Sequence, residues 1–234
     1  MSVADESKAG NAQSTPLQPK ALKNGIFVVG HPRSGTSLAC QLLESAGVKF
    51  LSDMQSDEYN KSGYFELFGA KELEKKLIEK AMNEETIPEL NRVVERLNSS
   101  AGLSGLKIVH IPALFFYRHI AKNIRVVFIY RNPADVKASM LRRGISAFKL
   151  SWLENNNALI AAHENIRKSI VISYEALIAR KAGVKNAFRK LGFNVNLEVI
   201  RESEQSQKNS QIVISADEQK LFNRLRRLER RCCA

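Results

Sequence analysis

Short apolar runs alternate along the chain with longer segments in which apolar residues recur every three or four positions. A short run that is apolar throughout is typical of a strand buried on both faces of a parallel sheet, and the longer spacing is typical of a helix with one buried face. Their regular alternation predicts an α/β fold, with a doubly wound parallel sheet flanked by helices. The strands are predicted at residues 26–29, 48–51, 106–111, 125–130 and 169–173.

Helices are predicted between these strands from the same spacing and from residues that favour helix ends. Asn132 followed by Pro133 is typical of a helix start, because the asparagine side chain can accept from a free N–H group and proline has none to satisfy. Gly47 and Gly144 are typical of residues that follow a helix. The predicted helices are 38–46, 67–82, 88–97, 113–121, 133–143, 148–167 and 174–192.

The two ends of the chain differ in composition from the middle. Residues 1–22 are rich in Ser, Ala, Gln and Pro, and we expect a disordered leader there, because such a segment buries too little apolar surface to offset its ordering entropy. Residues 23–195 are the predicted α/β domain. Residues 196–234 are expected to form a polar connection and a basic amphipathic helix over 218–231, which packs on the domain rather than on a membrane.

Composition narrows the class of protein. The 234 residues suit one α/β domain, and a hydrophobic content of 44% is ordinary for a globular protein. No apolar run is long enough to span a bilayer, no signal-peptide pattern begins the chain, and the cysteines lack metal-ligand spacing, so a cytoplasmic protein is expected. The net charge of +12 favours anionic partners in general, nucleotides and nucleic acid alike, and does not choose among them.

The most specific local signal is Gly30–Ser37, G-H-P-R-S-G-T-S, between the first predicted strand and the first predicted helix. This arrangement brings backbone N–H groups and the positive end of a helix dipole to one point, which favours a bound phosphate or sulfate. The glycine spacing fits the P-loop pattern, but Thr36 stands where that pattern has lysine. Arg33 is the nearest cation, and its guanidinium can bind two oxygens of an anion. We therefore expect a P-loop-type fold that binds its anion without the usual magnesium nucleotide.

Ligands of open parallel sheets bind beyond the carboxyl ends of the strands, so residues at those ends should converge. Besides the glycine loop, three predicted strands end at or next to His110, Arg131 and Tyr174. Arg131 and Ser139, which follows eight residues later on a predicted helix, offer a cation and a hydroxyl to a second phosphate. The alternative for Arg131 is a surface ion pair with Asp135.

Two of these segments together resemble the nucleotide signatures of the sulfotransferase family, whose donor is 3'-phosphoadenosine 5'-phosphosulfate (PAPS). They are G-H-P-R-S-G-T-S and, in the middle of the chain, Y-R-N-P-A-D-V-K-A-S. The resemblance implies that Arg131 and Ser139 hold the 3'-phosphate. It also implies a 5'-phosphosulfate site made of the loop residues Arg33, Ser34, Gly35, Thr36 and Ser37.

Two shorter segments extend the resemblance, which spans about residues 26–192. Gly63–Glu66 is similar to the G-Y-[FW]-E segment of bacterial members. Ser173–Leu177 is similar to the family's Y-E-x-L segment, which implies a contact of Tyr174 on the adenine side. Many eukaryotic cytosolic members have lysine in place of Arg33. They also have a basic R-K-G-x-x-G-D-W-K segment, which this sequence lacks. The contact that this segment makes to the 3'-phosphate is therefore either absent here or supplied from elsewhere, with the arginine-rich C-terminal stretch as a candidate.

Sulfuryl transfer needs a base for the acceptor's proton and cations for the developing negative charge, and it needs no metal. Arg33 and the loop N–H groups can supply positive charge. Glu66 resembles the glutamate of bacterial and protein-tyrosine members, and as a base it would need a pKa raised by burial. His110 resembles the histidine in the H-x-P of cytosolic members, and imidazole as a group titrates near neutral pH. The structural alternative for Glu66 is an ordinary turn carboxylate, and for His110 it is a satisfied core histidine. Lys107 is a weaker candidate, for the contact with the leaving group.

The sequence thus predicts a PAPS-dependent sulfotransferase, closer to bacterial members, that acts on a hydroxyl or amine of a small molecule, lipid or saccharide. A metal-dependent P-loop kinase is a second hypothesis, disfavoured because Thr36 replaces the lysine that contacts the β- and γ-phosphates. A third is a non-catalytic nucleotide- or nucleic-acid-binding protein, motivated by the net charge, although the aromatic platforms expected for single strands are not evident. A metal cofactor, a nucleic-acid partner and a membrane span are not expected.

Overall fold

The structure is a computed structural model that describes residues 17–54, 63–100, 102–145, 151–200 and 212–234. Within these ranges five parallel strands form one sheet in the spatial order β2-β3-β1-β4-β5. Their bounds are β1 Gly25–Gly30, β2 Val48–Phe50, β3 Leu103–Ile108, β4 Ile124–Tyr130 and β5 Ser169–Ser173.

The central strand, β1, is buried along its whole length between β3 and β4. Its apolar run faces helices on both sides of the sheet, which is why no polar alternation appears in its sequence. Val28 of β1 lies level with Lys107 of β3, so a lysine from the neighbouring strand stands beside the strand that leads into the glycine loop. The doubly wound parallel sheet predicted from the apolar runs is confirmed.

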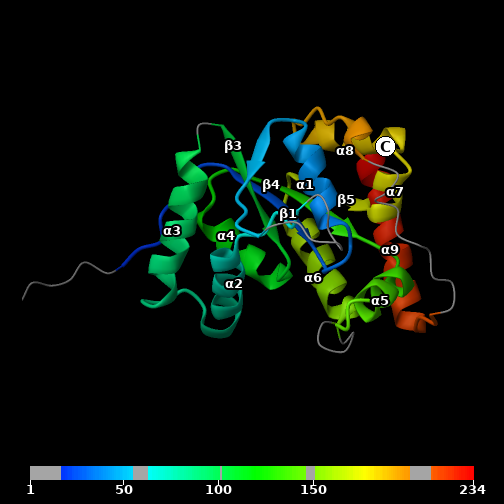
Figure 1. Cartoon of the computed structure of the whole chain (residues 1–234), viewed down its shortest axis with the longest axis horizontal. Helices are drawn as coiled ribbons and strands as arrows, with labels where there is room; N and C mark the ends of the chain where they lie inside the picture. Colours follow the sequence, from blue (N-terminus) through cyan, green and yellow to red (C-terminus); the bar gives the residue numbers. More distant parts are fainter. Residues whose placement is uncertain (1–16, 55–62, 101, 146–150, 201–211) are drawn as a thin grey trace, which may run out of the picture.

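Helices flank the sheet (Figure 1). In that view α2, α3 and α4 gather beside β3, whereas α5, α7, α8 and α9 lie beside β5. α1 packs against β1, β3 and β4, and α6 packs against β1, β4 and β5. The α-helices are α1 Thr36–Glu44, α2 Phe68–Lys80, α3 Thr86–Ser99, α4 Leu114–Ile120, α5 Pro133–Leu141, α6 Trp152–Asn165, α7 Tyr174–Ile178, α8 Ala182–Lys190 and α9 Ala216–Cys233. Two 3-10 turns are η1 Ile111–Ala113 and η3 Leu197–Val199.

Several boundaries differ from those predicted by the sequence, and two of these differences have a local cause. β3 ends at Ile108, because the chain bends before His110 and enters the 3-10 turn that contains Pro112. The helix expected over 174–192 is divided into α7 and α8. Arg180, with a φ of 47°, lies between them in a left-handed conformation that does not continue a right-handed helix.

α6 begins later than expected for a reason that the sequence contains. The Ser151 side chain accepts a hydrogen bond from the N–H of Glu154, so this serine is the N-cap of the helix. Residues 148–150 of the expected helix lie outside the described residues.

The C-terminal helix, α9, packs against β5, α6 and α8. Its N-terminus is fixed by a capping box between Ser215 and Glu218, and Leu225 is fully buried on its inner face. Glu229 accepts hydrogen bonds from the Tyr130 hydroxyl at 2.7 Å and the Ser173 N–H at 2.8 Å, which ties the helix to the carboxyl ends of β4 and β5. In the part of the chain that the structure describes, no helix is both long and apolar enough to span a membrane.

Part of the leader expected over residues 1–22 lies within the described ranges. Leu22 is fully buried and forms a parallel bridge with Ala121. The N–H of Lys20 donates a hydrogen bond of 2.6 Å to the Asn91 side chain of α3. Lys20 and Leu22 thus contact the domain, and residues 1–16 lie outside the described residues.

Candidate active site

The loop between β1 and α1 is shaped by close packing around two glycines. A Cβ on Gly30 would lie 2.3 Å from the backbone oxygen of Ile129, and a Cβ on Gly35 would lie 2.5 Å from the Tyr174 ring. Gly35 also has a φ of 92° and directly precedes α1, which begins at Thr36. Because the first N–H groups of a helix have no partner within it, the start of α1 favours an anion bound at this loop.

Three residues converge at the side of the loop that faces α5: Arg33, Arg131 and Ser139. The Nε of Arg33 donates to the Ser139 hydroxyl at 3.1 Å, and Nη1 of Arg131 donates to the backbone oxygen of Arg33 at 3.3 Å. Both Arg131 and Ser139 are buried. The backbone oxygen of Arg131 accepts from the Trp152 indole at 3.2 Å, which fixes the end of β4. Two guanidinium groups and a hydroxyl from three separate segments thus meet at one place.

Two buried polar atoms at the loop are candidates for contact with a ligand. The Ser34 hydroxyl and Nε of Arg131 have no hydrogen-bond partner among the described residues. Buried polar groups are normally hydrogen-bonded, and a buried donor on a cation is costly to leave without a partner. These two residues therefore fit a site that binds a phosphate or sulfate.

Tyr174 begins α7 and fills the space between Gly35 and Arg131. The Arg131 guanidinium carbon lies 4.3 Å from the centre of the Tyr174 ring, a cation–π contact. On the next residue, the Glu175 carboxylate accepts the N–H of Asn132 at 3.1 Å, and burial raises the pKa of this carboxyl. The expected adenine contact of Tyr174 remains a prediction; the observed packing shows that the tyrosine supports both the loop and Arg131.

On the other side of the loop, Lys107 joins β3 to the start of α1. Its ammonium lies 3.3 Å from the Ser37 hydroxyl and 2.8 Å from Oε1 of Glu66, and it also donates to the backbone oxygen of Tyr64. Lys71 of α2 pairs with the second Glu66 oxygen at 3.0 Å. Lys107 therefore supplies a buried cation beside a loop whose own sequence has threonine in place of lysine.

The pKa of Glu66 is shifted in the opposite direction from the one expected of a glutamate base. Burial alone would raise its pKa, but Lys107 and Lys71 outweigh burial and hold the pKa of Glu66 below its ordinary value. The raised pKa that a glutamate base needs is therefore not observed. Glu66 is a carboxylate held between two ammonium groups.

His110 lies two residues beyond the end of β3 and is held by a buried carboxylate. Its Nδ1 is 3.2 Å from Oε2 of Glu74, and its backbone N–H donates to the same oxygen at 3.4 Å. The Glu74 side chain is 1% exposed, whereas that of His110 is 20% exposed. Burial raises the pKa of Glu74, while the His110 contacts act in the opposite direction. One edge of the imidazole is thus fixed.

The sequence matches a family model described as a sulfotransferase domain over residues 23–184, more than half of the chain. The chain belongs to the sulfotransferase family. Among solved structures, it resembles the sulfotransferase domain of the Synechococcus PCC 7002 olefin synthase, with a TM-score of 0.56 and 14% identity, covering 91% of this chain and 98% of that one. It also matches mouse sulfotransferase SULT7A1 complexed with PAP, with a TM-score of 0.43 and 16% identity, covering 86% and 73% of the two chains. No curated protein sequence matches it significantly.

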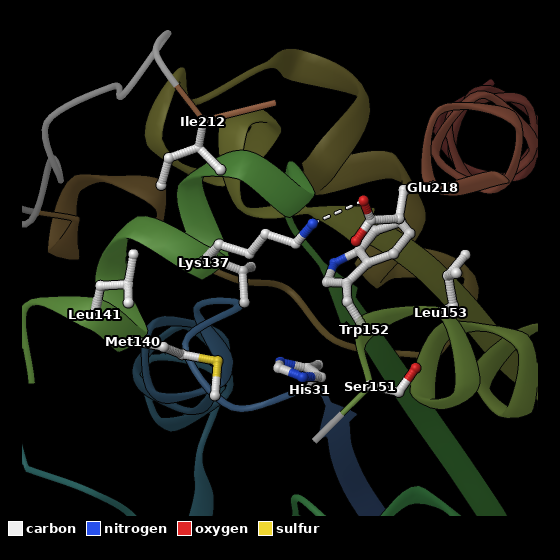
Figure 2. Close-up of a pocket in the computed structure, with 10 residues that line it drawn as sticks. His31, Lys137, Met140, Leu141, Ser151, Trp152, Leu153, Ile212 and Glu218 are labelled. Carbon is white, nitrogen blue, oxygen red and sulfur yellow. Dashed lines mark hydrogen bonds and ion pairs between the residues drawn. The ribbon is translucent and has the colours of Figure 1, made fainter. Parts of the chain in front are cut away.

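A separate cavity of about 460 Å³ lies on another face of α5 from Ser139 in this sulfotransferase. Figure 2 shows Lys137 reaching across it to Glu218 of α9, above the Trp152 indole, and the two charged groups are 2.8 Å apart. The other lining residues are His31, Val136, Met140, Leu141, Ser151, Leu153 and Ile212. This cavity is mainly apolar and holds none of the residues expected to bind the nucleotide.

Sequence reasoning missed Glu74 and underrated Lys107. Glu74 lies among Ala70, Leu73 and Leu77, the buried stripe of α2, and a carboxylate on such a stripe is a signal that could have been found. The place of Lys107 depends on how β3 aligns with β1, which local patterns do not encode.

Proposed function

We propose that this sulfotransferase transfers a sulfuryl group from PAPS to a hydroxyl or amine of a small molecule, lipid or saccharide. The observation that carries the proposal is the placement of cations on both sides of one glycine loop. Arg33 and Arg131 lie with Ser139 on one side, and Lys107 lies with Ser37 and Glu66 on the other. This arrangement suits a nucleotide with one anionic group at the loop and another beside α5.

The residues that would hold the donor follow from this geometry. The loop from Arg33 to Ser37 and the N–H groups at the start of α1 would bind the 5'-phosphosulfate, and Arg131 with Ser139 would bind the 3'-phosphate. The partnerless Nε of Arg131 supports this assignment, since a phosphate oxygen would complete its hydrogen bonding. When bound, PAPS supplies the sulfuryl group.

Lys107 and Arg33 would stabilise the negative charge that develops on the leaving phosphate and on the sulfuryl oxygens. Lys107 is suited to this role because it is buried beside Ser37, where its charge is poorly screened by water. In this respect Lys107 takes the place of the lysine that the P-loop pattern has at Thr36.

The contacts favour His110 over Glu66 as the base. Both Glu66 oxygens are paired with lysines and its pKa is lowered, so it has little tendency to accept a proton at neutral pH. Of the two ring nitrogens of His110, only Nδ1 has a contact among the described residues. Imidazole as a group titrates close to neutral pH. Nε2 of His110 would take the acceptor's proton as the acceptor oxygen or nitrogen bonds to sulfur and the sulfur–oxygen bond to the 5'-phosphate breaks.

The proposal is tested by thermal unfolding with adenosine 3',5'-bisphosphate in a buffer that contains EDTA. A ligand that binds only the folded protein stabilises it by about 2.7 kcal/mol at a hundredfold excess over Kd, so the melting temperature should rise. Adenosine 5'-phosphate is the matched control, because it lacks the 3'-phosphate and should give a smaller rise. A rise with ATP and magnesium but none with the bisphosphate would favour a kinase and refute the proposal.

A further inference from the structure

We propose that Glu74 is a positioning residue, whose carboxylate holds the His110 ring with its hydrogen on Nδ1 and its lone pair on Nε2. This inference rests on the proposed function, because it takes His110 as the base. Glu74 itself touches neither donor nor acceptor in this scheme. It acts by fixing the orientation and the tautomer of the imidazole.

The first argument is the geometry of a single oxygen atom. Oε2 of Glu74 is within hydrogen-bonding distance of two nitrogens of the same residue, Nδ1 of the His110 ring at 3.2 Å and the His110 backbone N at 3.4 Å. An ionised carboxylate oxygen can only accept, so both His110 nitrogens that face it, the backbone N and Nδ1, are assigned as donors. A neutral imidazole with its hydrogen on Nδ1 has its lone pair on Nε2. The contact at Nδ1 also restricts rotation of the ring, and the backbone contact holds the residue that carries it.

The second argument is the position of Glu74. It belongs to the buried stripe of α2, next to Leu73 and facing the same way as Leu77, and its side chain is 1% exposed. Burying a carboxylate is costly without compensation. Among the described residues the one ion-pair partner within 4 Å is His110, which is neutral until protonated. An apolar residue would serve packing better at this position, so the carboxylate is best explained by its action on His110.

Glu66 provides a contrast within the same region. Its carboxylate is paired with Lys107 and Lys71, and these lysines hold its pKa below the ordinary value. Glu74 has no lysine partner among the described residues, and burial raises its pKa. Of the two glutamates, Glu74 is therefore the one whose carboxylate faces the imidazole instead of a lysine.

The same contact would act during the reaction. When Nε2 of His110 takes the acceptor's proton, the ring becomes a cation, and a carboxylate beside Nδ1 stabilises that cation without itself becoming protonated. The other titratable groups around the pair are Glu72 of α2, which interacts with His110, and Glu66, which interacts with Glu74. Tyr117 of α4 lies close enough to Glu74 to interact with its charge, and burial and Glu74 together raise the pKa of the Tyr117 hydroxyl.

The test is nitrogen NMR of the full-length protein labelled with ¹⁵N-histidine. The chain has four histidines, and the His110 signals are assigned by their loss in His110→Asn. In the wild-type protein the neutral ring should show the Nδ1–H tautomer. Glu74→Gln removes the charge, and the titration midpoint of His110 should fall by roughly 1 to 3 pH units, the usual effect of an opposite charge at this distance. Tyr117→Phe is the matched control, because it alters a buried neighbour of Glu74 without removing the carboxylate, and it should leave tautomer and midpoint unchanged.

Turnover is followed as the slow hydrolysis of PAPS, in which water replaces the unknown acceptor. Glu74→Gln should lower the hydrolysis rate constant at neutral pH by on the order of 10- to 100-fold, move the pH profile with the NMR midpoint, and leave the Kd for adenosine 3',5'-bisphosphate unchanged. Glu74→Asp should keep part of the rate that Glu74→Gln loses, because it retains the charge.

Either of two results overturns the inference: an Nε2–H tautomer in the wild-type protein, or a His110 midpoint that is the same in Glu74→Gln as in Tyr117→Phe. If Glu74→Gln does not fold, the wild-type tautomer and the midpoint in Glu74→Asp decide the question. Failure of the proposed function would look different, because the protein would then not bind adenosine 3',5'-bisphosphate although the His110 tautomer was as stated.

Discussion

Replacing Arg131 with methionine tests the assignment of the second phosphate site. Methionine keeps an unbranched stem against the Tyr174 ring but removes the guanidinium, whose carbon lies 4.3 Å from the ring centre; the whole Arg131 residue is only 3% exposed. Nη1 of Arg131 already binds the backbone oxygen of Arg33, while Nε has no partner among the described residues. The variant should therefore lose a charged hydrogen bond to the ligand and also loosen the loop slightly.

A hydrogen bond to a charged group contributes about 1.5 to 3 kcal/mol. This corresponds to a rise in Kd of about 10- to 150-fold. Isothermal titration calorimetry should show this loss for adenosine 3',5'-bisphosphate in Arg131→Met. Adenosine 5'-phosphate, which lacks the 3'-phosphate, should show only the small loss that comes from the loosened loop.

The chain offers a matched control in Arg125→Met. Arg125 lies at the opposite end of β4, and its guanidinium carbon is 4.7 Å from the Phe193 ring, so the change removes a similar cation–π contact far from the loop. Binding of both ligands should be unchanged in this variant. Equal losses for the two ligands in Arg131→Met, or an equal loss in Arg125→Met, would refute the assignment of Arg131 to the 3'-phosphate.

Three further predictions follow from packing and charge. Leu225→Ala should lower the free energy of unfolding, measured in urea, by about 2 to 5 kcal/mol, the usual effect of truncating a buried leucine. The control Arg226→Ala, at an exposed position of the same helix, should change it little. Equal effects would show that α9 is not part of the folded core. Gly35→Ala should weaken binding of the bisphosphate by calorimetry, because it combines a φ of 92° with a clash against Tyr174, and unaltered affinity would contradict the described loop. Because the pKa of Glu66 is lowered on folding, its ion pairs stabilise the protein above the unfolded pKa and lose this effect as pH falls through the folded pKa. Glu66→Gln should therefore be less stable than the wild type at neutral pH and equally stable in acid; the same difference at both pH values would contradict this.

Local patterns were sufficient for the sheet. The strand over 169–173 was predicted with the observed bounds, because an apolar run between polar segments needs no knowledge of the rest of the fold. The glycine loop was also found locally, because an apolar strand precedes Gly30 and a helix follows Gly35, and this context makes the glycine spacing specific. Boundaries set by single backbone conformations, such as the left-handed Arg180, were missed because arginine gives no local signal for that conformation.

The site was predicted in part, and the missing part depends on tertiary contacts. Arg33, Arg131 and Ser139 are brought together as the two motifs implied. The lowered pKa of Glu66 could not be deduced, because its partner Lys107 is distant in sequence and is placed by strand register. Glu74 had a local signal in the apolar stripe of α2, but its partner His110 becomes apparent only when α2 is packed beside the end of β3.

A crystal structure with adenosine 3',5'-bisphosphate tests the central claim most directly. We expect the 5'-phosphate at the backbone N–H groups between Arg33 and Ser37, and the 3'-phosphate within hydrogen-bonding distance of Nε of Arg131 and the Ser139 hydroxyl. The Lys107 ammonium and Nε2 of His110 should face the space beyond the 5'-phosphate. A nucleotide bound away from the glycine loop, or one whose 3'-phosphate points into solvent while Arg131 stays without a ligand, would contradict the account.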